Sequence, residues 1–76
     1  MNLEHELRKI VSSVLNINET ELDQLTYGES HNWDSMKHFL LVVSLEERFN
    51  IEISDDESNK LRNLEEIKIY LDRKLN

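Results

Sequence analysis

Trp33-Asp34-Ser35-Met36 introduces a long apolar segment, residues 36–49, that contains neither glycine nor proline. Asp34 is a favourable N-cap residue, because its carboxylate can accept a hydrogen bond from a backbone amide two or three residues later. The sequence therefore predicts a helix that begins at Asp34 or Ser35 and ends near Phe49.

The predicted helix has two apolar faces when successive residues are placed about 100° apart. One face carries His38 together with Leu41, Val42, Leu45 and Phe49. The nearly opposite face carries Met36, Phe39, Leu40 and Val43, joined by Glu47. A surface helix needs only one apolar stripe. The second stripe either packs on the long loop or another helix, or forms a docking surface that leads away from Ser35.

On the N-terminal side, a first helix is expected from about Leu3 to Leu15. Its apolar residues recur at helical spacing and form one stripe: Leu3, Leu7, Ile10, Val11 and Val14. Residues 16–34 then form a long connection, which a short turn at Thr20 to Leu25 is expected to fix to the core. A connection this long in so small a domain is usually functional or flexible, although it can also be a simple crossover between helices.

On the C-terminal side, Ile51-Glu52-Ile53 is expected to be a short extended connector with both isoleucines inward. Ser54 and Glu57 have the spacing of a capping box, which predicts a short third helix that ends at about Leu61. Asn63 and Glu66 repeat that device before the last helix, whose buried stripe is expected to be Leu64, Ile67, Leu71 and Leu75. These patterns predict an all-α domain with three long helices and one short one.

Composition limits what such a chain can do. Its 76 residues allow a single small domain, which hides only about 60% of its unfolded surface and leaves no room for an enclosed catalytic cleft. The net charge of −7 argues against binding to nucleic acid or an anionic membrane, and it favours a basic patch on a protein partner. The sequence has no cysteine, no apolar run of membrane-spanning length and no signal-peptide pattern. A cytoplasmic, non-enzymatic module is therefore expected.

The Ser35 hydroxyl is the best candidate for a functional atom. A phosphodiester on it would lie near the backbone amides and the positive end of the following helix. The simpler interpretation is that Asp34 and Ser35 are ordinary residues of a helix start.

Other kinds of site are weaker. His31, Asp34 and His38 could in principle hold a metal, but a loop histidine and a semi-buried histidine explain them better. Helix caps likewise explain a partial calcium-loop pattern, in which Lys60 replaces the required glycine: Asp55, Glu57, Asn59 and Glu66. Residues 28–32 lack the second glycine of a hydrolase nucleophile elbow. We therefore predict neither a metal site nor a catalytic residue.

One set of motifs occurs in order along the chain: Asp34-Ser35-Met36, Leu41-Val42 and Leu45-Glu46-Glu47-Arg48-Phe49-Asn50-Ile51-Glu52-Ile53. Residues 54–57, 61–64 and Tyr70-Leu71 continue the set. With these motifs the chain resembles an acyl carrier protein over essentially its whole length. The resemblance implies a small four-helix bundle, a single carrier domain over 1–76, and a Ser35 that receives 4′-phosphopantetheine from coenzyme A. The thiol of that arm would carry an acyl or aminoacyl group as a thioester.

Several residues depart from the pattern of fatty-acid carriers. Lys37 and Leu40 stand at helix positions that are commonly acidic there, Trp33 replaces a small residue, and Met36 replaces leucine. These departures suggest a stand-alone carrier of a specialised pathway rather than of routine fatty-acid synthesis. They also make the surroundings of Ser35, including Trp33, Lys37 and Leu40, the expected seat of partner specificity.

The resemblance implies three kinds of partner for a monomeric carrier. These are a phosphopantetheinyl transferase, an acyl- or aminoacyl-loading enzyme, and an acyltransferase or synthase with a basic and apolar docking patch. The expected motif and docking residues are Asp34, Met36, Leu40, Val43 and Glu47. Two alternatives stay open: an aminoacyl or peptidyl carrier, and an acidic helical interaction module without a prosthetic group.

Overall fold

Helical segments account for most of residues 2–75, the part of the chain that the computed structural model describes. In chain order they are α1 (Leu3–Leu15), the 3₁₀ helix η1 (Glu19–Gln24), α2 (Ser35–Phe49), α3 (Asp55–Lys60) and α4 (Leu64–Leu75). The described residues contain no strand. The all-α prediction, with three long helices and one short one, is confirmed.

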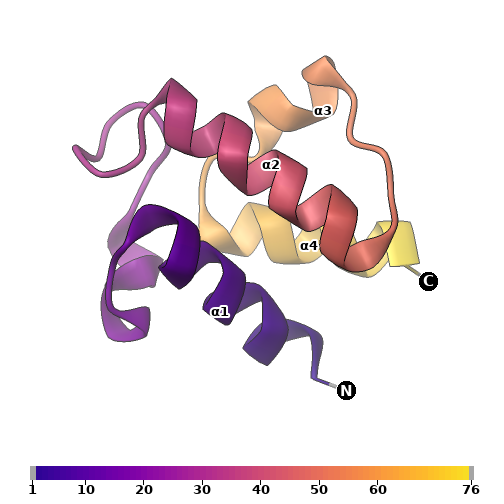
Figure 1. Ribbon diagram of the computed structural model, residues 1–76, viewed down its shortest axis with the longest axis horizontal. Coiled ribbons are helices and arrows are strands. Elements are labelled where there is room, and N and C mark those ends of the chain that lie inside the picture. The colour runs from indigo at the N-terminus through magenta and orange to yellow at the C-terminus, as the bar shows by residue number, and fades with distance from the viewer. Residues whose placement is uncertain (1, 76) are drawn as a thin grey trace.

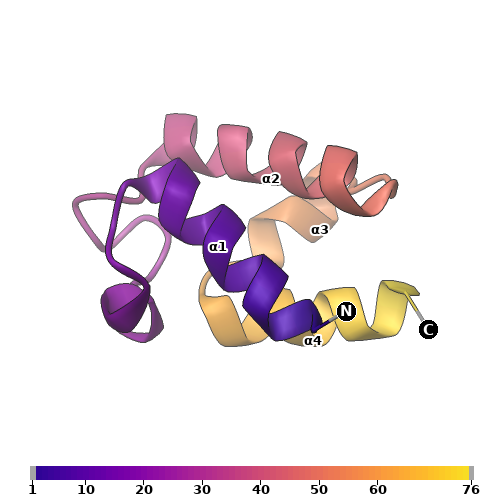
Figure 2. The ribbon, with the colours of Figure 1, turned by 60° about the horizontal axis from the view of Figure 1, so that its bottom comes forward.

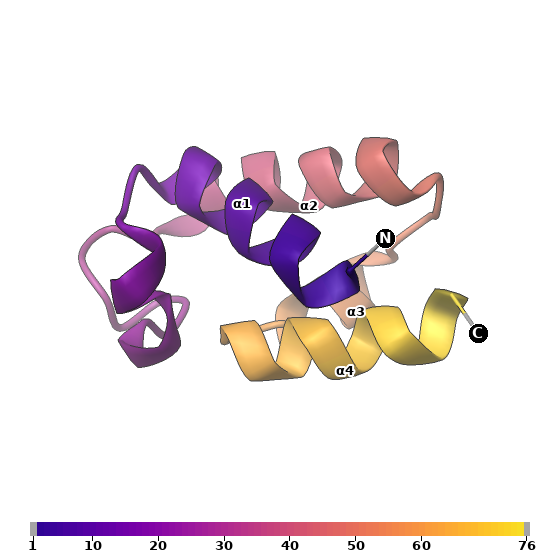
Figure 3. The same cartoon turned by 90° about the horizontal axis from the view of Figure 1, so that it is seen from below.

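The three long helices surround one core. α2 and α4 run in the same general direction, and α1 runs against them across one side of the molecule (Figures 2 and 3). The short α3 lies on the side opposite α1 (Figure 1). The connection between α1 and α2 loops out beyond one end of the long helices, and its 3₁₀ helix packs against α1 and α4.

The core is built from the apolar stripes of the long helices. α1, α2 and α4 each place three leucines, isoleucines or valines into it, and the connections add four more apolar side chains. The buried apolar residues are Leu7, Val11, Leu15, Leu22, Trp33, Leu41, Val42, Leu45, Ile53, Leu61, Leu64, Ile67 and Leu71. Because α3 contributes none of them, this helix is the element with the weakest packing of its own.

Capping side chains start the helices where the sequence predicts them. Ser54 Oγ accepts from the backbone amide of Glu57 at 3.1 Å, and Glu57 Oε1 accepts from the amide of Ser54 at 2.9 Å, which completes the capping box of α3. α1 and α2 both end at an asparagine in the left-handed conformation, Asn16 with φ of 57° and Asn50 with φ of 54°. Asparagine tolerates this conformation better than most residues, so it suits these helix ends.

Two expectations about α4 need correction. Leu75 is not part of the buried stripe, since 44% of its surface is exposed. The end of α4 projects past the beginning of α1, so α1 does not cover this residue (Figure 3). At the other end, Asn63 Oδ1 caps the Glu66 amide at 2.8 Å, but the Glu66 carboxylate accepts from the amide of Arg62 rather than of Asn63. The predicted capping box is therefore only half formed: the Asn63 side chain caps as expected, but the Glu66 carboxylate bonds to the residue before the N-cap.

Candidate functional site

Ser35 is the first residue of α2, and its side chain is exposed. Asp34 caps the helix as predicted, with its Oδ1 accepting from the amide of Lys37 at 2.9 Å. None of the hydrogen bonds among residues 2–75 involves the Ser35 hydroxyl. The structure thus presents a free hydroxyl at the positive end of a 15-residue helix, where a negatively charged substituent is favoured.

A shallow groove of about 250 Å³ runs from Ser35 between α2 and α3. Phe39 and Val43 of α2 and Ile53 of the connector supply apolar parts of its wall. Polar groups complete it, among them Glu46, Asp55, Ser58 and Asn59. A group attached to Ser35 therefore has a mixed polar and apolar surface directly beside it.

Trp33 is the main departure from the expected site. It is fully buried, so it cannot belong to a surface that a partner touches. Its indole Nε1 donates to His38 Nδ1 at 3.0 Å, and its backbone carbonyl accepts from the amide of Gly28 at 3.0 Å. Trp33 is a core residue that fixes the loop before α2, and the expectation that it helps to select partners directly is wrong.

The second apolar stripe of α2 is exposed. Met36 is 73% exposed, Phe39 66% and Leu40 47%, while Val43 is half-buried and Glu47 is exposed. Neither the long loop nor another helix covers the three most exposed side chains. The alternative that the whole stripe packs inside the molecule is therefore wrong, except for part of Val43.

Two charged residues beside the stripe are engaged within the molecule. Lys37 Nζ donates to the carbonyl of Val14 at 3.3 Å, in the last turn of α1, where a cation is favourable. Glu46 Oε2 accepts from the amide of Ile53 at 2.9 Å and holds the α2–α3 connector. Of the two acidic residues that follow each other on α2, Glu47 is the one left facing solvent.

The residues considered and rejected as metal ligands, His31, Asp34 and His38, do not form a metal-binding cluster. His38 is buried with both ring nitrogens hydrogen-bonded, while His31 is an exposed loop residue. No group of three or more histidine, aspartate or glutamate side chains in residues 2–75 is arranged to hold a metal ion. Glu57 and Glu66 of the partial calcium pattern are occupied by the helix caps described above.

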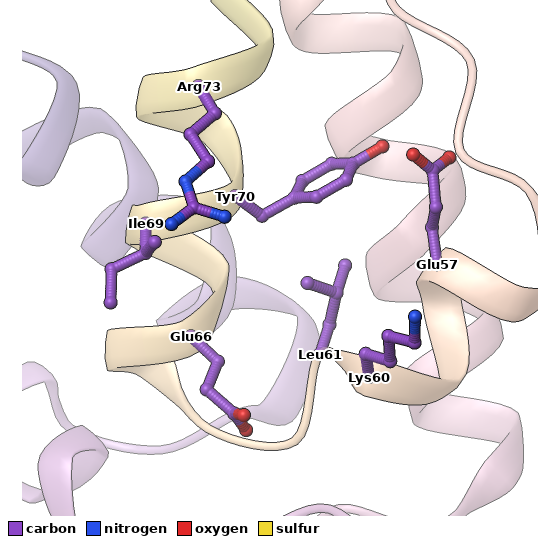
Figure 4. Close-up of a pocket in the computed structure, with 7 residues that line it drawn as sticks. All are labelled: Glu57, Lys60, Leu61, Glu66, Ile69, Tyr70 and Arg73. Atoms are coloured by element: carbon purple, nitrogen blue, oxygen red, sulfur yellow. The ribbon is translucent and has the colours of Figure 1, made fainter.

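A second groove, of about 380 Å³, lies between α3 and α4 (Figure 4). Leu61 and Ile69 are its apolar residues, and Arg73 and Lys60 lie at opposite sides of it (Figure 4). Burial and the nearby Glu57 carboxylate raise the pKa of Tyr70 to about 12, so this phenol stays protonated at neutral pH. No α2 residue lines this groove, which is therefore separate from the groove beside Ser35.

Sequence reasoning missed two features of the site. Phe39 was placed on the second stripe but not among the docking residues, although its exposure exceeds that of Leu40. Tyr27, which stacks on His38 with ring centroids 3.8 Å apart, was not singled out at all. The helical position of Phe39 already carried the necessary signal, whereas nothing in the loop sequence around Tyr27 indicates which way that ring points.

Comparison with known proteins agrees with this arrangement. The family model described as the phosphopantetheine attachment site matches residues 5–71. The chain is 34% identical to an acyl carrier protein of Buchnera aphidicola subsp. Schizaphis graminum, over 96% of this chain and 94% of that protein. It is 31% identical to an acyl carrier protein of Chlamydia caviae, over 93% of this chain and 94% of the relative. It is 32% identical to an acyl carrier protein of Wolinella succinogenes, over 88% of this chain and 90% of that protein.

The chain belongs to the acyl carrier protein family, whose members attach 4′-phosphopantetheine covalently. Its function is that of an acyl carrier protein. The described residues 2–75 include no helix that is long and apolar enough to cross a membrane.

Proposed function

We propose that Ser35 is the attachment residue for 4′-phosphopantetheine and that residues 1–76 act as one non-catalytic carrier domain. The observation that carries the proposal is the exposed, unbonded Ser35 hydroxyl at the N-terminus of α2, preceded by an Asp34 that is already committed to capping. When bound, the prosthetic group supplies a terminal thiol that holds an acyl group as a thioester. Support for a single domain comes from one core cluster that joins α1, α2 and α4.

The attachment requires a hydroxyl that a second protein can reach. A bond forms between Ser35 Oγ and phosphorus, the pyrophosphate bond of coenzyme A breaks, the nucleotide part leaves, and the hydroxyl proton is lost. The product is a phosphodiester with one negative charge. Its place beside the amides of Ser35 and Met36, which Asp34 does not occupy, is electrostatically favourable, so the residues present suit the group.

Catalysis of the transfer is assigned to a separate enzyme. Asp34 is bonded to the amide of Lys37, and the two ring nitrogens of His38 are bonded to Trp33 and to the Ser58 carbonyl. In this structure neither side chain acts as a base for the Ser35 hydroxyl. A phosphopantetheinyl transferase must therefore supply the base and coenzyme A.

The exposed stripe of α2 is the proposed docking surface. Asp34 and Ser35 lie at its head, and it continues along the helix through Met36, Phe39, Leu40, Val43 and Glu47. Its apolar residues suit an apolar patch on a loading enzyme, an acyltransferase or a synthase. The net charge of −7 suits a basic rim around that patch, since complementary charge speeds encounter.

Intact-mass measurement tests the attachment site. The chain is co-expressed with a phosphopantetheinyl transferase of broad specificity, and the wild-type protein is expected to gain the mass of one phosphopantetheine group. Ser35→Ala is expected to gain none, while Ser13→Ala, which changes an exposed serine on α1, is expected to behave as the wild type. Equal modification of the Ser35→Ala variant would show that the site is elsewhere.

The same preparation separates the remaining alternatives. Incubating the modified protein with adenylating enzymes for fatty acids and for amino acids shows which class of cargo is loaded. An aminoacyl carrier accepts an amino acid, and an acyl carrier accepts a fatty or other carboxylic acid. If a native partner binds Ser35→Ala and the modified protein equally well, the chain acts as an interaction module for that partner.

A further inference from the structure

Trp33 and His38 are hydrogen-bonded to each other across Ser35. Trp33 precedes the serine by two residues and is fully buried, and His38 follows it by three residues and is 4% exposed. The 3.0 Å bond from the indole Nε1 to His38 Nδ1 closes a small ring of chain that contains Asp34 and Ser35. The position of the Ser35 hydroxyl therefore depends on a buried polar contact as well as on the helix cap.

This contact fixes the protonation state of His38. An indole nitrogen can only donate, so His38 Nδ1 must accept and cannot carry a proton. The single ring proton is then on Nε2, which donates to the backbone carbonyl of Ser58 in α3 at 2.8 Å. Only the neutral ring with its proton on Nε2 satisfies both bonds. A second proton would place an N–H of His38 directly against the N–H of Trp33.

The same histidine joins three parts of the chain. Tyr27 of the long loop stacks on the imidazole, with ring centroids 3.8 Å apart and an interplanar angle of 7°. Tyr27 is in turn held by Arg62, because its amide donates to the Arg62 carbonyl and its carbonyl accepts from Arg62 Nη2, both at 2.7 Å. His38 thus connects the Ser35 turn to α3 and to the loop that precedes α2.

α3 depends on such contacts because it buries no side chain of its own. Besides the bond from His38 to Ser58, a 3.7 Å ion pair links Glu57 of α3 to Lys74 of α4. Both members of that pair are partly exposed, and exposed ion pairs stabilise a fold only weakly. The bond from His38 to the Ser58 carbonyl is therefore a direct hydrogen bond from α2 to α3, and it acts beside the buried residues Ile53 and Leu61 that flank α3.

We propose that neutral His38 is a positioning residue for the attachment serine, and that its protonation loosens the Ser35 turn and α3 together. Trp33 acts through His38 in the same role. The inference rests on the proposed attachment at Ser35. It goes beyond that proposal by making the geometry of the serine sensitive to pH.

Electrostatics places this transition below neutral pH. Burial lowers the pKa of His38 from 6.5, the positive charge of Arg62 lowers it further, and the bond to the Ser58 carbonyl opposes both. Because the folded state binds the proton less tightly than the unfolded chain, the contribution of His38 to stability is complete above pH 6.5. It is lost as the pH falls through the folded-state pKa. The remaining ionisable groups beside the ring, or in the groove that it lines, are Tyr27 of the loop, the N-cap residue Asp34, Glu46 of α2 and Asp55 of α3.

NMR titration tests the contact without any modification of Ser35. The chain has one tryptophan, so its indole N–H signal is unambiguous. The Ser35→Ala variant is used because it cannot carry the prosthetic group. As the pH falls, we expect its indole N–H signal to shift and to exchange faster with water. Both changes are expected to have the midpoint at which His38 titrates, below pH 6.5. Trp33→Phe removes the donor that faces Nδ1 and is expected to raise that midpoint. An indole signal that does not respond while His38 titrates would overturn the proposal, even if Trp33→Phe fails to fold.

Modification kinetics test the consequence for Ser35. His38→Gln can still donate to the Ser58 carbonyl but does not titrate, and His5→Gln makes the same change at an exposed histidine of α1. Rates of phosphopantetheine attachment are compared at each pH with one transferase, so that the pH dependence of the enzyme cancels. Relative to His38→Gln, the wild type and His5→Gln are expected to slow about tenfold at one pH unit below the His38 midpoint. A ratio of one at every pH would show that His38 does not position Ser35, and a constant ratio other than one would show that its protonation does not loosen the Ser35 turn.

The two experiments also separate this inference from the proposed function. If no transferase modifies the wild type while the NMR response is as expected, the attachment site is wrong and the His38 contact is real. If Ser35 is modified but the indole signal is insensitive to pH, the attachment site stands and the role given to His38 is wrong.

Discussion

Gly28 shows how one residue shapes the loop that leads to Ser35. Its φ of +86° lies in the region that residues with a side chain rarely adopt. A Cβ added there would lie 3.2 Å from Arg62 Nη2, which is already bonded to the Tyr27 carbonyl. The Arg62 guanidinium also lies 5.4 Å from the centre of the Tyr27 ring, so a shift of this group disturbs its contacts with Tyr27.

Gly28→Ala is therefore expected to destabilise the protein by about 1–2 kcal/mol, through backbone strain and displacement of Arg62. Urea unfolding followed by circular dichroism measures the change. Glu29→Ala, which alters the exposed neighbour of Gly28, serves as the control and is expected to change stability by less than about 0.5 kcal/mol. A Gly28→Ala protein as stable as the wild type would contradict the strain inferred here.

At the residue scale, sequence reasoning predicted the buried face of α2 and misplaced Trp33, which precedes that helix. His38 was correctly expected on the core face, because the helical period assigns a direction to every residue of α2. Trp33 stands before the helix, where no period applies, and it was placed at a partner surface although it is buried. The contact between Trp33 and His38 could not be predicted from the sequence, since it depends on the path of the loop.

At the element scale, α2 buries one apolar face and leaves the other to solvent. Leu41 and Leu45 are fully buried, whereas Leu40, which is in the same helix, is 47% exposed. A single helix can thus contribute to the core and retain an apolar surface near Ser35. That division allows a substitution on the outer face to change binding without affecting the fold.

Leu40→Glu is expected to weaken binding to a native partner by about tenfold or more, because it places a charge in an apolar contact, and to change the melting temperature little. Titration calorimetry and thermal unfolding measure the two effects. Ile69→Glu is a matched control, since Ile69 is 44% exposed but lies on α4. Equal binding by both variants and the wild type would argue that the stripe is not a docking surface.

The long α1–α2 connection is attached to α1 by Arg8. Its guanidinium donates to both carboxylate oxygens of Asp23, at 3.1 and 2.9 Å, and to the carbonyl of Glu19 at 2.8 Å. These bonds hold η1 at both of its ends. They explain why this long connection, whose length alone is compatible with a functional loop, a flexible loop or a simple crossover, has a defined structure through η1.

Arg8→Lys keeps the charge but loses the planar fork that makes three bonds at once. Faster amide hydrogen exchange is expected in residues 19–24, by roughly fivefold, with little change in α4. Arg48→Lys is the comparison, because Arg48 pairs with Glu6 and not with η1. If amide exchange in η1 stays at the wild-type rate in Arg8→Lys, the buried side chain of Leu22 holds η1 in place without Arg8.

Capping residues and the spacing of apolar residues predicted where the helices begin and which of their faces are buried. Asp34 and Ser54 start α2 and α3 as expected, because a capping side chain acts within three residues. Leu75 has the helical spacing of the buried stripe of α4, but it is partly exposed. Helical spacing predicts which face of a helix a residue lies on, but it does not predict how far the neighbouring helix extends along that face. The mutual arrangement of the helices came from the family resemblance rather than from any local pattern.

At the scale of the whole molecule, opposite charges attract at short range and like charges repel over the entire surface. Four ion pairs lie within residues 2–75; those of Arg8, Lys68 and Lys74 have N–O separations of 2.9, 3.0 and 3.7 Å. The excess of acidic residues, 16 against 9 basic ones, is spread over a body of 31 × 26 × 18 Å. The screening length falls from about 30 Å at 0.01 M salt to about 10 Å at 0.1 M. Added salt therefore weakens the long-range repulsion more than it weakens the close pairs.

We expect the melting temperature to rise by several degrees, of the order of 4–8 °C for about 1 kcal/mol, when NaCl is raised from about 0.01 to 0.2 M. Differential scanning calorimetry at pH 7.5 keeps His38 neutral, so the response reports charge screening and not the Trp33 contact. MgCl₂ at equal ionic strength gives the same rise if screening is the only cause, and a larger rise if the acidic surface binds the cation. A fall with NaCl would mean that the close ion pairs outweigh the net charge of −7 in the stability of this fold.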